Sequence, residues 1–552
     1  MTPTTETTAT AEAAGRILDA FAALDPCTAV VDAGAQDAAT LTDYSPAGHA
    51  ARAGLAASAL RDLEKLTPAA GRDRIVRDHL AERLGSRIAF HTAGEDVREL
   101  HVAATGPLQM LRQAIEAAVP PADAAPEQRD AGWALVAERL ADLPRALAGY
   151  AESLTLAASR GHVAARRQVE LCAQRSAVWA QDAATFAARC GDGSARPALD
   201  RAAADAAQAY HRFGAFLTAD LAPHAPEQEA FGEERYATWV RAFLGGEPDL
   251  RELYAWGWAE LRDIEAELAR EAAAILPGAS VPEVVDRLDE GAVGEVLIGR
   301  DVFAGWLQNL LDDTVRRLDG VHFDIPEPLR RLESRLSATS GICYIGPSQD
   351  LTRPGRVWWQ IDDDQERFPV WHVYSTAYHE GVPGHHLQIG LEACEGELGQ
   401  RLNLLGGLSG CAEGWGLYAE RLMDELGYYE QPGARLGHLV SQLLRAARVV
   451  IDIGLHLRLE VPDRPGELWR PEIALDWLEN RVYQGQYATS ELARYLGRPA
   501  QALAYKVGEK VWLDGRAAAG LEQREFHRRA LALGSMGLGA LSTQLAALAR
   551  GR

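Results

Sequence analysis

HEGVPGHH, residues 379–386, is the stretch of this 552-residue chain that decides which fold and chemistry to expect. It places three imidazoles and one carboxylate within a single short segment. A zinc hydrolase needs three protein ligands, an open position for water and a carboxylate that takes the water's proton. A regular helix supplies two of the ligands as His at i and i+4, with Glu directly after the first His. Position 383 is Pro instead of His, so the regular spacing fails.

An irregular helix could still bring two of these histidines to one metal ion. On an ideal helix, i+6 lies roughly on the opposite face from i, and i+7 lies about 10 Å further along the axis. Neither His385 nor His386 can therefore join His379 on a regular helix. Pro383 removes a backbone donor and Gly384 tolerates unusual dihedral angles, so we expect a bulge or kink here.

A bulge that absorbs two residues places His385 beside His379 as the second ligand. His386 remains the alternative second ligand, and otherwise we expect it to support the site or contact the substrate. The competing interpretation of the whole segment is a helix terminus with surface histidines.

The third ligand is expected in CAEGWGLYAE, residues 411–420. Glu413 and Glu420 are seven residues apart and share one helix face, so one could bind metal while the other orients a histidine. We predict Glu413 as the ligand because it opens the helix in a glycine-rich setting that permits close approach.

The composition predicts which kinds of partner the protein lacks. Hydrophobic residues make up 47% of the chain, and 78 acidic residues against 56 basic ones give a net charge of −22. Such an acidic surface repels phosphate backbones and anionic lipid, so we expect neither nucleic acid nor membrane as a partner. The N-terminal residues show no signal-peptide pattern, which predicts a cytoplasmic protein.

The pattern of apolar residues predicts a mainly α fold. Residues 1–14 read as a disordered N-terminus, 15–243 as a helical region and 244–552 as the metal-binding region, with both regions forming one compact unit. Within the second region, Gly341–Ile345 and Arg356–Ile361 predict strands of a small β-sheet next to the histidine motif. The second strand could offer its edge to an extended peptide. Helices are predicted over Ala377–Glu392 and Glu491–Val511, among others.

Several segments together resemble the bacterial domain-of-unknown-function family 885 (DUF885), which the resemblance places in the gluzincin clan of metallopeptidases. They are HEGVPGHHLQ, AEGWGLYAERL, CYIGPSQDLTRPGRVWWQID, RAARVVIDIGLHLRLE, GRPAQALAYKVGEKVW and EFHRRALALGSMGL. The resemblance covers most of the chain. It implies zinc, with His379, His385 and Glu413 as ligands and Glu380 as the base. It also implies a two-lobed helical shell around a deep cleft, and Tyr505 as a donor to the oxyanion.

Arg448, Asp452 and His456 form a polar stripe at i, i+4 and i+8 on an otherwise apolar helix. The stripe is either a buried strut or a wall of the cleft. As a wall, it would let His456 donate to the oxyanion and Arg448 hold a substrate carboxylate. Tyr344 and Arg353 are further candidates for substrate binding.

The predicted function is therefore a zinc-dependent hydrolase that cleaves amide bonds in short peptides or peptide-like metabolites, with Glu380 as general base. One alternative is a metalloenzyme that acts on a non-peptide metabolite in a biosynthetic pathway. A second is a non-catalytic helical scaffold. The ligand set also suits Mn²⁺ or Co²⁺, and the sequence leaves the oligomeric state open.

Overall fold

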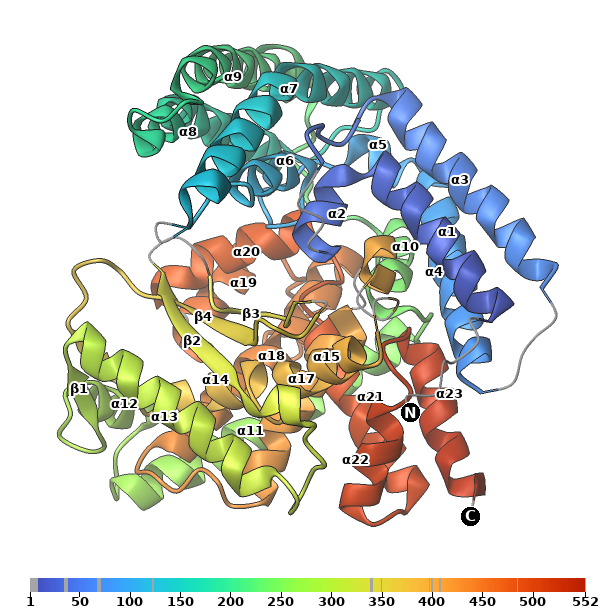
Figure 1. The fold of residues 1–552 in the computed structure, drawn as a ribbon. Coiled ribbons are helices and arrows are strands. Elements are labelled where there is room, and N and C mark those ends of the chain that lie inside the picture. The colour runs from blue at the N-terminus through green and yellow to red at the C-terminus, as the bar shows by residue number, and fades with distance from the viewer. Residues whose placement is uncertain are drawn as a thin grey trace. The chain divides into compact units, whose positions relative to one another are not determined.

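The computed structural model describes residues 8–33, 38–66, 71–121, 124–337, 341–348, 350–396, 398, 401–406, 409–483 and 485–551. The described chain is mainly helical (Figure 1). It divides into two compact units. Unit 1 comprises Met1–Ala242, Arg401–Gly407 and Thr489–Pro499, and unit 2 comprises Phe243–Gln400, Leu408–Ala488 and Ala500–Arg552. The first division along the chain falls beside the boundary expected at 243/244, but two later segments return to unit 1.

Unit 1 is built from helices whose apolar faces pack on one another. Helices α7, α8 and α9 pack closely together and share a core that includes Leu140, Tyr150, Phe186 and Phe213 (Figure 1). The helices that begin in unit 1 are α1 (Ala9–Leu24), α2 (Pro26–Ala33), α3 (Pro46–Glu64), α4 (Arg72–Thr92), α5 (Glu95–Arg98), α6 (Pro107–Glu116), α7 (Pro126–Ser159), α8 (Arg166–Cys190), α9 (Arg196–Phe216), η1 (Leu217–Leu221), η2 (Ala222–His224), α10 (Glu233–Leu244) and η4 (Leu402–Leu405).

Unit 2 carries every segment that the sequence analysis connected with the metal site. Its helices are α11 (Leu250–Ile275), α12 (Val281–Asp289), α13 (Arg300–Leu318), η3 (Glu327–Arg330), α14 (Val373–Glu380), α15 (His385–Cys394), α17 (Ser409–Glu425), α18 (Ala434–Leu457), α19 (Pro471–Asp476), η5 (Trp477–Arg481), η6 (Gly485–Tyr487), α21 (Ala504–Ala519), α22 (Gln523–Leu531), α23 (Leu538–Ala547) and η7 (Leu548–Gly551). Helix α20 (Ala488–Gly497) belongs to unit 1 from its second residue onward.

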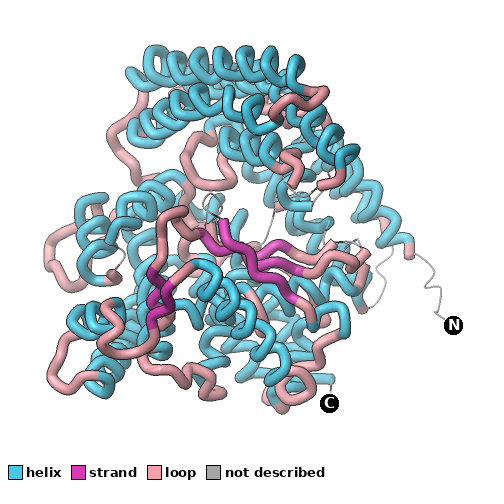
Figure 2. Tube along the Cα trace, turned by 60° about the vertical axis from the view of Figure 1, so that its left-hand side comes forward, coloured by secondary structure: helices cyan, strands magenta, loops and turns pink. Residues whose placement is uncertain are grey.

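Two small sheets lie among the helices of unit 2 (Figure 2). In the larger one, β4 (Gly355–Gln360) lies between β2 (Leu332–Ser337), which runs parallel to it, and β3 (Cys343–Ile345), which runs antiparallel. In the smaller one, β1 (Val296–Ile298) pairs with β5 (Arg367–Pro369) in antiparallel fashion. The two predicted strands are confirmed as β3 and β4. The predicted edge at β4 is wrong, because β4 is bonded on both sides; among the described strands of this sheet, β2 and β3 form the edges.

Two further expectations need correction. Helix α1 begins at Ala9, with the Thr8 side chain accepting from the backbone N–H of Ala11, so the disorder predicted for residues 9–14 is wrong. Residues 1–7 lie outside the described part of the chain. The helix predicted over Glu491–Val511 is two helices, because α20 ends at Gly497 and α21 begins only at Ala504.

Helices α17 and α21 approach each other closely, and this brings the start of α21 to the metal motif. A Cβ atom on Gly508 would lie 1.9 Å from the backbone oxygen of Gly410, and one on Gly414 would lie 2.4 Å from the backbone of Gly508. Glycine is therefore required at this crossing, since any side chain would separate the two helices. The crossing brings Tyr505, at the start of α21, into the same part of unit 2 as Glu413 of α17.

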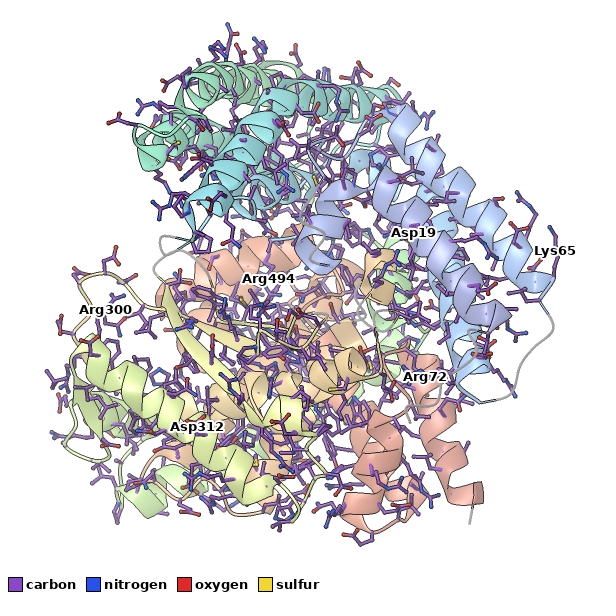
Figure 3. All side chains as sticks on the ribbon, in the orientation of Figure 1. Asp19, Lys65, Arg72, Arg300, Asp312 and Arg494 are labelled. Atoms are coloured by element: carbon purple, nitrogen blue, oxygen red, sulfur yellow. The ribbon has the colours of Figure 1, made fainter. Side chains whose placement is uncertain are left out.

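Charged side chains cover the outer faces of the helices. Lys65 and Asp312, labelled in Figure 3, are both exposed. No helix within the described ranges combines the length and the apolar character that crossing a membrane requires.

Candidate metal centre

The histidine motif contains a complete break between two helices. Helix α14 ends at Glu380 and α15 begins at His385, and the Val382–Pro383 peptide between them is cis. The backbone N–H of Gly384 donates to the oxygen of Tyr378 at 3.0 Å. A Cβ on Gly384 would lie 1.9 Å from the backbone oxygen of His379, so only glycine fits there. The expected irregularity is confirmed, and it is a full interruption of the helix.

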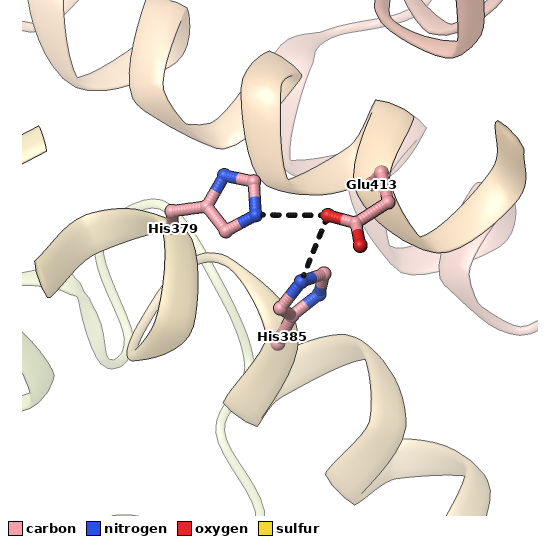
Figure 4. Close-up of side chains that lie close together, drawn as sticks. All are labelled: His379, His385 and Glu413. Atoms are coloured by element: carbon pink, nitrogen blue, oxygen red, sulfur yellow. Dashed lines mark hydrogen bonds and ion pairs between the residues drawn. The ribbon is translucent and has the colours of Figure 1, made fainter. Parts of the chain in front are cut away.

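The break brings His379 and His385 together with Glu413. Oε2 of Glu413 lies 3.2 Å from Nε2 of His379 and 3.5 Å from Nε2 of His385 (Figure 4). The ligand atoms of all three residues lie within 4.8 Å of one another. The structure thus assembles the two histidines and the glutamate predicted as ligands, from α14, α15 and α17.

The distances from Glu413 to the two histidines fit zinc. Zinc binds His nitrogen and carboxylate oxygen at about 2.0–2.2 Å with tetrahedral angles, which separates neighbouring ligand atoms by roughly 3.3 Å. The two measured separations, 3.2 and 3.5 Å, bracket that value. Two imidazoles and one carboxylate are also the donor set of several catalytic zinc sites.

Glu420 holds the other nitrogen of His379. Nδ1 of His379 lies 2.8 Å from Oε1 of Glu420, which is almost wholly buried. Because a carboxylate only accepts hydrogen bonds, Nδ1 donates to Glu420, and Nε2, which faces Glu413, is the nitrogen that could bind a metal once it has lost its own proton. Of the two roles that the sequence left open for the glutamates, Glu420 therefore has the orienting one and Glu413 the position of the ligand.

The Glu420 carboxylate is itself fixed by α14 and α18. The Ser375 hydroxyl donates to Oε2 of Glu420 at 2.5 Å, and the Ser441 hydroxyl does so at 3.3 Å. Nδ1 of His438 lies 3.7 Å from the same oxygen. These three residues were not among those predicted for the site. Ser375 could have been found, because it stands four residues before His379 and so shares its helix face.

Opposing effects set the protonation of this cluster. Burial disfavours the charged form of His379, but its hydrogen bonds to Glu413 and Glu420 outweigh burial and raise the pKa of His379 to about 10. Burial would raise the pKa of Glu413, yet hydrogen bonds with His379 and His385 prevail and lower it. The metal-free cluster is therefore a set of charge-assisted hydrogen bonds that a metal ion would replace.

Glu380 lies beside the three ligand residues with one oxygen unsatisfied. It is 9% exposed, and Oε2 has no hydrogen-bond partner among the described residues. Burial raises the pKa of Glu380, although the nearby His385 and His379 act in the opposite direction. A raised pKa suits a group that must accept and later release a proton near neutral pH.

His386 does not join the metal cluster. Its Nε2 lies 2.8 Å from the backbone oxygen of Leu329 and its Nδ1 lies 3.0 Å from the Tyr344 hydroxyl. A carbonyl only accepts, so Nε2 donates to Leu329 and Nδ1 accepts from Tyr344. Burial lowers the pKa of His386 to about 4, even though the Leu329 bond acts against it. His386 is thus a neutral, buried link between α15 and β3, and this link confirms the small sheet beside the motif.

Tyr505 lies next to the cluster, as expected. Its ring stacks on that of His379, with centroids 6.4 Å apart and an interplanar angle of 24°. The Arg448 guanidinium carbon lies 4.9 Å from the centroid of the Tyr505 ring. Arg448 and His379 therefore both lie close to the ring of Tyr505.

The rest of the polar stripe on α18 is buried. Oδ2 of Asp452 accepts from the backbone N–H of Ala500 at 2.8 Å, and Nε2 of His456 lies 4.0 Å from Oδ1 of Asp452. Neither Asp452 nor His456 has any exposed surface. The predicted contact between His456 and the oxyanion is therefore corrected: a side chain with no exposed surface cannot meet a substrate in this conformation. The strut interpretation describes these two residues.

Two other predicted substrate contacts also serve the protein itself. The Arg353 guanidinium donates to the backbone oxygens of Gly346 at 2.7 Å and Pro354 at 3.1 Å. Arg353 therefore closes its own loop between β3 and β4. The Tyr344 hydroxyl is bound to His386, as described above. Both side chains are thus held by contacts within the protein, and a contact of either one with a substrate stays a prediction.

Comparison with known proteins identifies the family. The family model described as "Bacterial protein of unknown function (DUF885)" matches residues 28–545. The chain belongs to the DUF885 family. Among proteins with curated descriptions, none matches this DUF885 member.

Two solved structures share the fold of this DUF885 chain. A candidate lipoprotein of Colwellia psychrerythraea is 20% identical, with a TM-score of 0.78 over 99% of this chain and 100% of the other. A candidate lipoprotein of unknown function from Shewanella oneidensis is 16% identical, with a TM-score of 0.73 over 98% of this chain and 100% of the other. At these identities the likeness shows a common fold, and it leaves the activity of the DUF885 chain to be argued from its site.

Proposed function

We propose that this protein is a zinc-dependent hydrolase that cleaves amide bonds in short peptides or peptide-like metabolites. The observation that supports this most is the convergence of His379, His385 and Glu413 on one point, with the unsatisfied carboxylate of Glu380 beside it. The proposal also places the protein among gluzincin-type metallopeptidases, with a two-lobed shell around a deep cleft.

The residues have separate tasks in the proposed reaction. Nε2 of His379, Nε2 of His385 and Oε2 of Glu413 would hold the ion. When bound, zinc lowers the pKa of a water molecule and polarises the scissile carbonyl. Oε2 of Glu380 takes the proton of the attacking water and later delivers it to the nitrogen of the leaving amine.

The remaining groups orient a metal ligand, stabilise the oxyanion and bind the substrate. Glu420 keeps the proton on Nδ1 of His379, which presents Nε2 to the ion. The Tyr505 hydroxyl donates to the oxyanion that forms when water adds to the carbonyl. Arg448, stacked over Tyr505, binds a carboxylate of the substrate in this proposal.

Metal analysis and one substitution test the proposal. The purified protein should contain about one zinc ion per chain, and a peptide library should be cleaved. Glu380→Gln should keep the metal and lose turnover by at least about 10²-fold, the usual contribution of a general base. Glu425→Gln, on α17 but bound to Arg516 through an exposed ion pair, is the matched control and should keep full activity.

The other outcomes separate the alternatives. Full activity in Glu380→Gln would overturn the assignment of the base. A zinc-loaded protein that cleaves no member of the library would favour a non-peptide metabolite as substrate. A protein that binds no metal and whose melting temperature ignores chelators and added zinc would be a helical scaffold.

A cytoplasmic location is part of the same proposal. It rests on the six cysteines, which are all free thiols, the state expected in a reducing compartment. Cell fractionation tests it: recovery of the native protein in the membrane fraction would contradict it.

A further inference from the structure

Trp415 connects the third ligand helix to the break in the histidine motif. It stands two residues after Glu413 on α17, and its side chain is fully buried. Its indole N–H donates to the backbone oxygen of Pro383 at 2.8 Å and is also 3.2 Å from that of Gly384. One donor on α17 therefore holds two consecutive carbonyls of the segment that separates His379 from His385.

These contacts lie where the metal cluster has the least support from regular structure. His379 ends one helix and His385 begins the next, so no continuous helix sets the distance between them. Their mutual position depends on the path of the backbone through Pro383 and Gly384. A side chain that donates hydrogen bonds to those two carbonyls restricts the path of the backbone.

Helix α17 thus meets the motif at two points. Glu413 contributes the carboxylate oxygen that lies 3.5 Å from Nε2 of His385. Trp415 holds the backbone immediately before His385. Since both contacts come from one rigid helix, a shift of the break relative to α17 would change the separation between Glu413 and His385.

We infer that Trp415 is a positioning residue for the metal centre, which fixes through its indole N–H the place of His385 relative to Glu413. This inference rests on the proposed metal site and adds to it a residue that contacts neither metal nor substrate. Its effect should appear in metal affinity, apart from any effect on the stability of the fold.

The chain offers a matched control in Trp512 of α21. The rings of Trp415 and Trp512 pack against each other at 4.9 Å and 68°, and both are almost wholly buried. The indole N–H of Trp512 also donates to a backbone oxygen, that of Cys411, at 3.3 Å. A change of either residue to Phe removes similar volume and one donor from the same cluster, but only Trp415 holds the break.

The experiment compares zinc affinity in wild type, Trp415→Phe and Trp512→Phe, by competition with a chromophoric chelator, and melting temperature for the same three proteins. We expect Trp415→Phe to bind zinc about 10-fold or more weakly, as losses of groups that orient metal ligands do. Trp512→Phe should lose stability to a similar extent and keep its zinc affinity within about twofold.

Equal zinc affinities in the two variants, at equal loss of stability, would overturn the inference. If Trp415→Phe does not fold, β-(3-benzothienyl)alanine at position 415 keeps the shape of the indole and replaces only its N–H by sulfur. Unchanged affinity in that protein would also overturn the inference. Wild type that binds no zinc at all is a separate outcome, which would overturn the proposed function.

Discussion

Nδ1 of His379 lies 2.8 Å from Oε1 of Glu420, and both side chains are almost wholly buried. The pair faces away from Glu413, which approaches the other nitrogen of the same ring. A single histidine is thus clamped between one glutamate in the position of a ligand and another that sets its tautomer. The site therefore has, besides three convergent side chains, a buried carboxylate that orients one of them.

Loss of the Glu420 charge should weaken metal binding. Glu420→Gln keeps the size of the side chain but removes the anion that fixes the Nδ1 proton of His379, so zinc affinity should fall by about 10- to 100-fold. Competition with a chelator measures the zinc affinity of the variant. The exposed Glu425 on the same helix provides the control, and equal affinities in Glu420→Gln and Glu425→Gln would contradict the orienting role.

The two adjacent histidines should behave differently. His385→Asn removes a ligand and should reduce bound zinc to well below one ion per chain. His386→Asn breaks the bonds to Leu329 and Tyr344, so it should lower the stability of the fold by about 1–3 kcal/mol while the zinc content stays near one. Elemental analysis and thermal melting separate the two effects. Loss of zinc in His386→Asn alone would reverse the assignment.

A methyl group at position 384 should displace the backbone between α14 and α15. The Cβ of Gly384→Ala would meet the backbone oxygen of His379, so the segment must move and both stability and zinc affinity should fall. Gly305→Ala on α13 is the control, since no atom outside its own helix lies within 4 Å of the new Cβ. That change should stabilise α13 by about 0.5–1 kcal/mol. Wild-type zinc affinity in Gly384→Ala would argue against the geometry described here.

Removal of the Tyr505 hydroxyl should reduce kcat without loss of metal. Tyr505→Phe keeps the ring stacked on His379 and removes the hydroxyl proposed to donate to the oxyanion, so kcat should fall by about 10²-fold with little change in KM. Tyr378→Phe is the control, because that hydroxyl donates to the backbone oxygen of Tyr428. Equal kcat values in the two variants would exclude the proposed task of Tyr505.

Unit 1 should lose stability in acid through His79. Burial, assisted by the charge of Arg83, lowers the pKa of His79 to about 3. The unfolded chain binds a proton at this residue below about pH 6.5 and the folded chain does not, so stability falls as the pH drops from about 6.5 toward 3. At pH 5 this amounts to about 2 kcal/mol.

His79→Leu should accordingly show a smaller decrease in melting temperature between pH 7 and pH 5 than wild type. His224, which is exposed, provides the comparison, and His224→Gln should show the wild-type decrease. An identical decrease in His79→Leu and wild type would mean that His79 does not contribute to acid sensitivity.

The sequence alone determined the helical character of the chain and the residue types of the site. Apolar periodicity predicted a mainly helical chain, and Pro383 with Gly384 predicted a bulge or kink in the helix that carries the histidines. These are local properties, because they depend on the backbone and on neighbours within a few residues. Strand β2 was not predicted, because Leu332–Ser337 lacks clear alternation of apolar residues and is held by its pairing with β4.

Only the tertiary structure decided between residues of the same type. His385 and His386 are adjacent and chemically identical, but the direction of α15 after the break turns one toward Glu413 and the other toward Leu329. Glu413 and Glu420 share a helix face, and the packing of α14 on α17 determines which nitrogen of His379 each one meets. Sequence spacing describes position along one element, whereas a metal site depends on distances between elements, and those distances arise from packing.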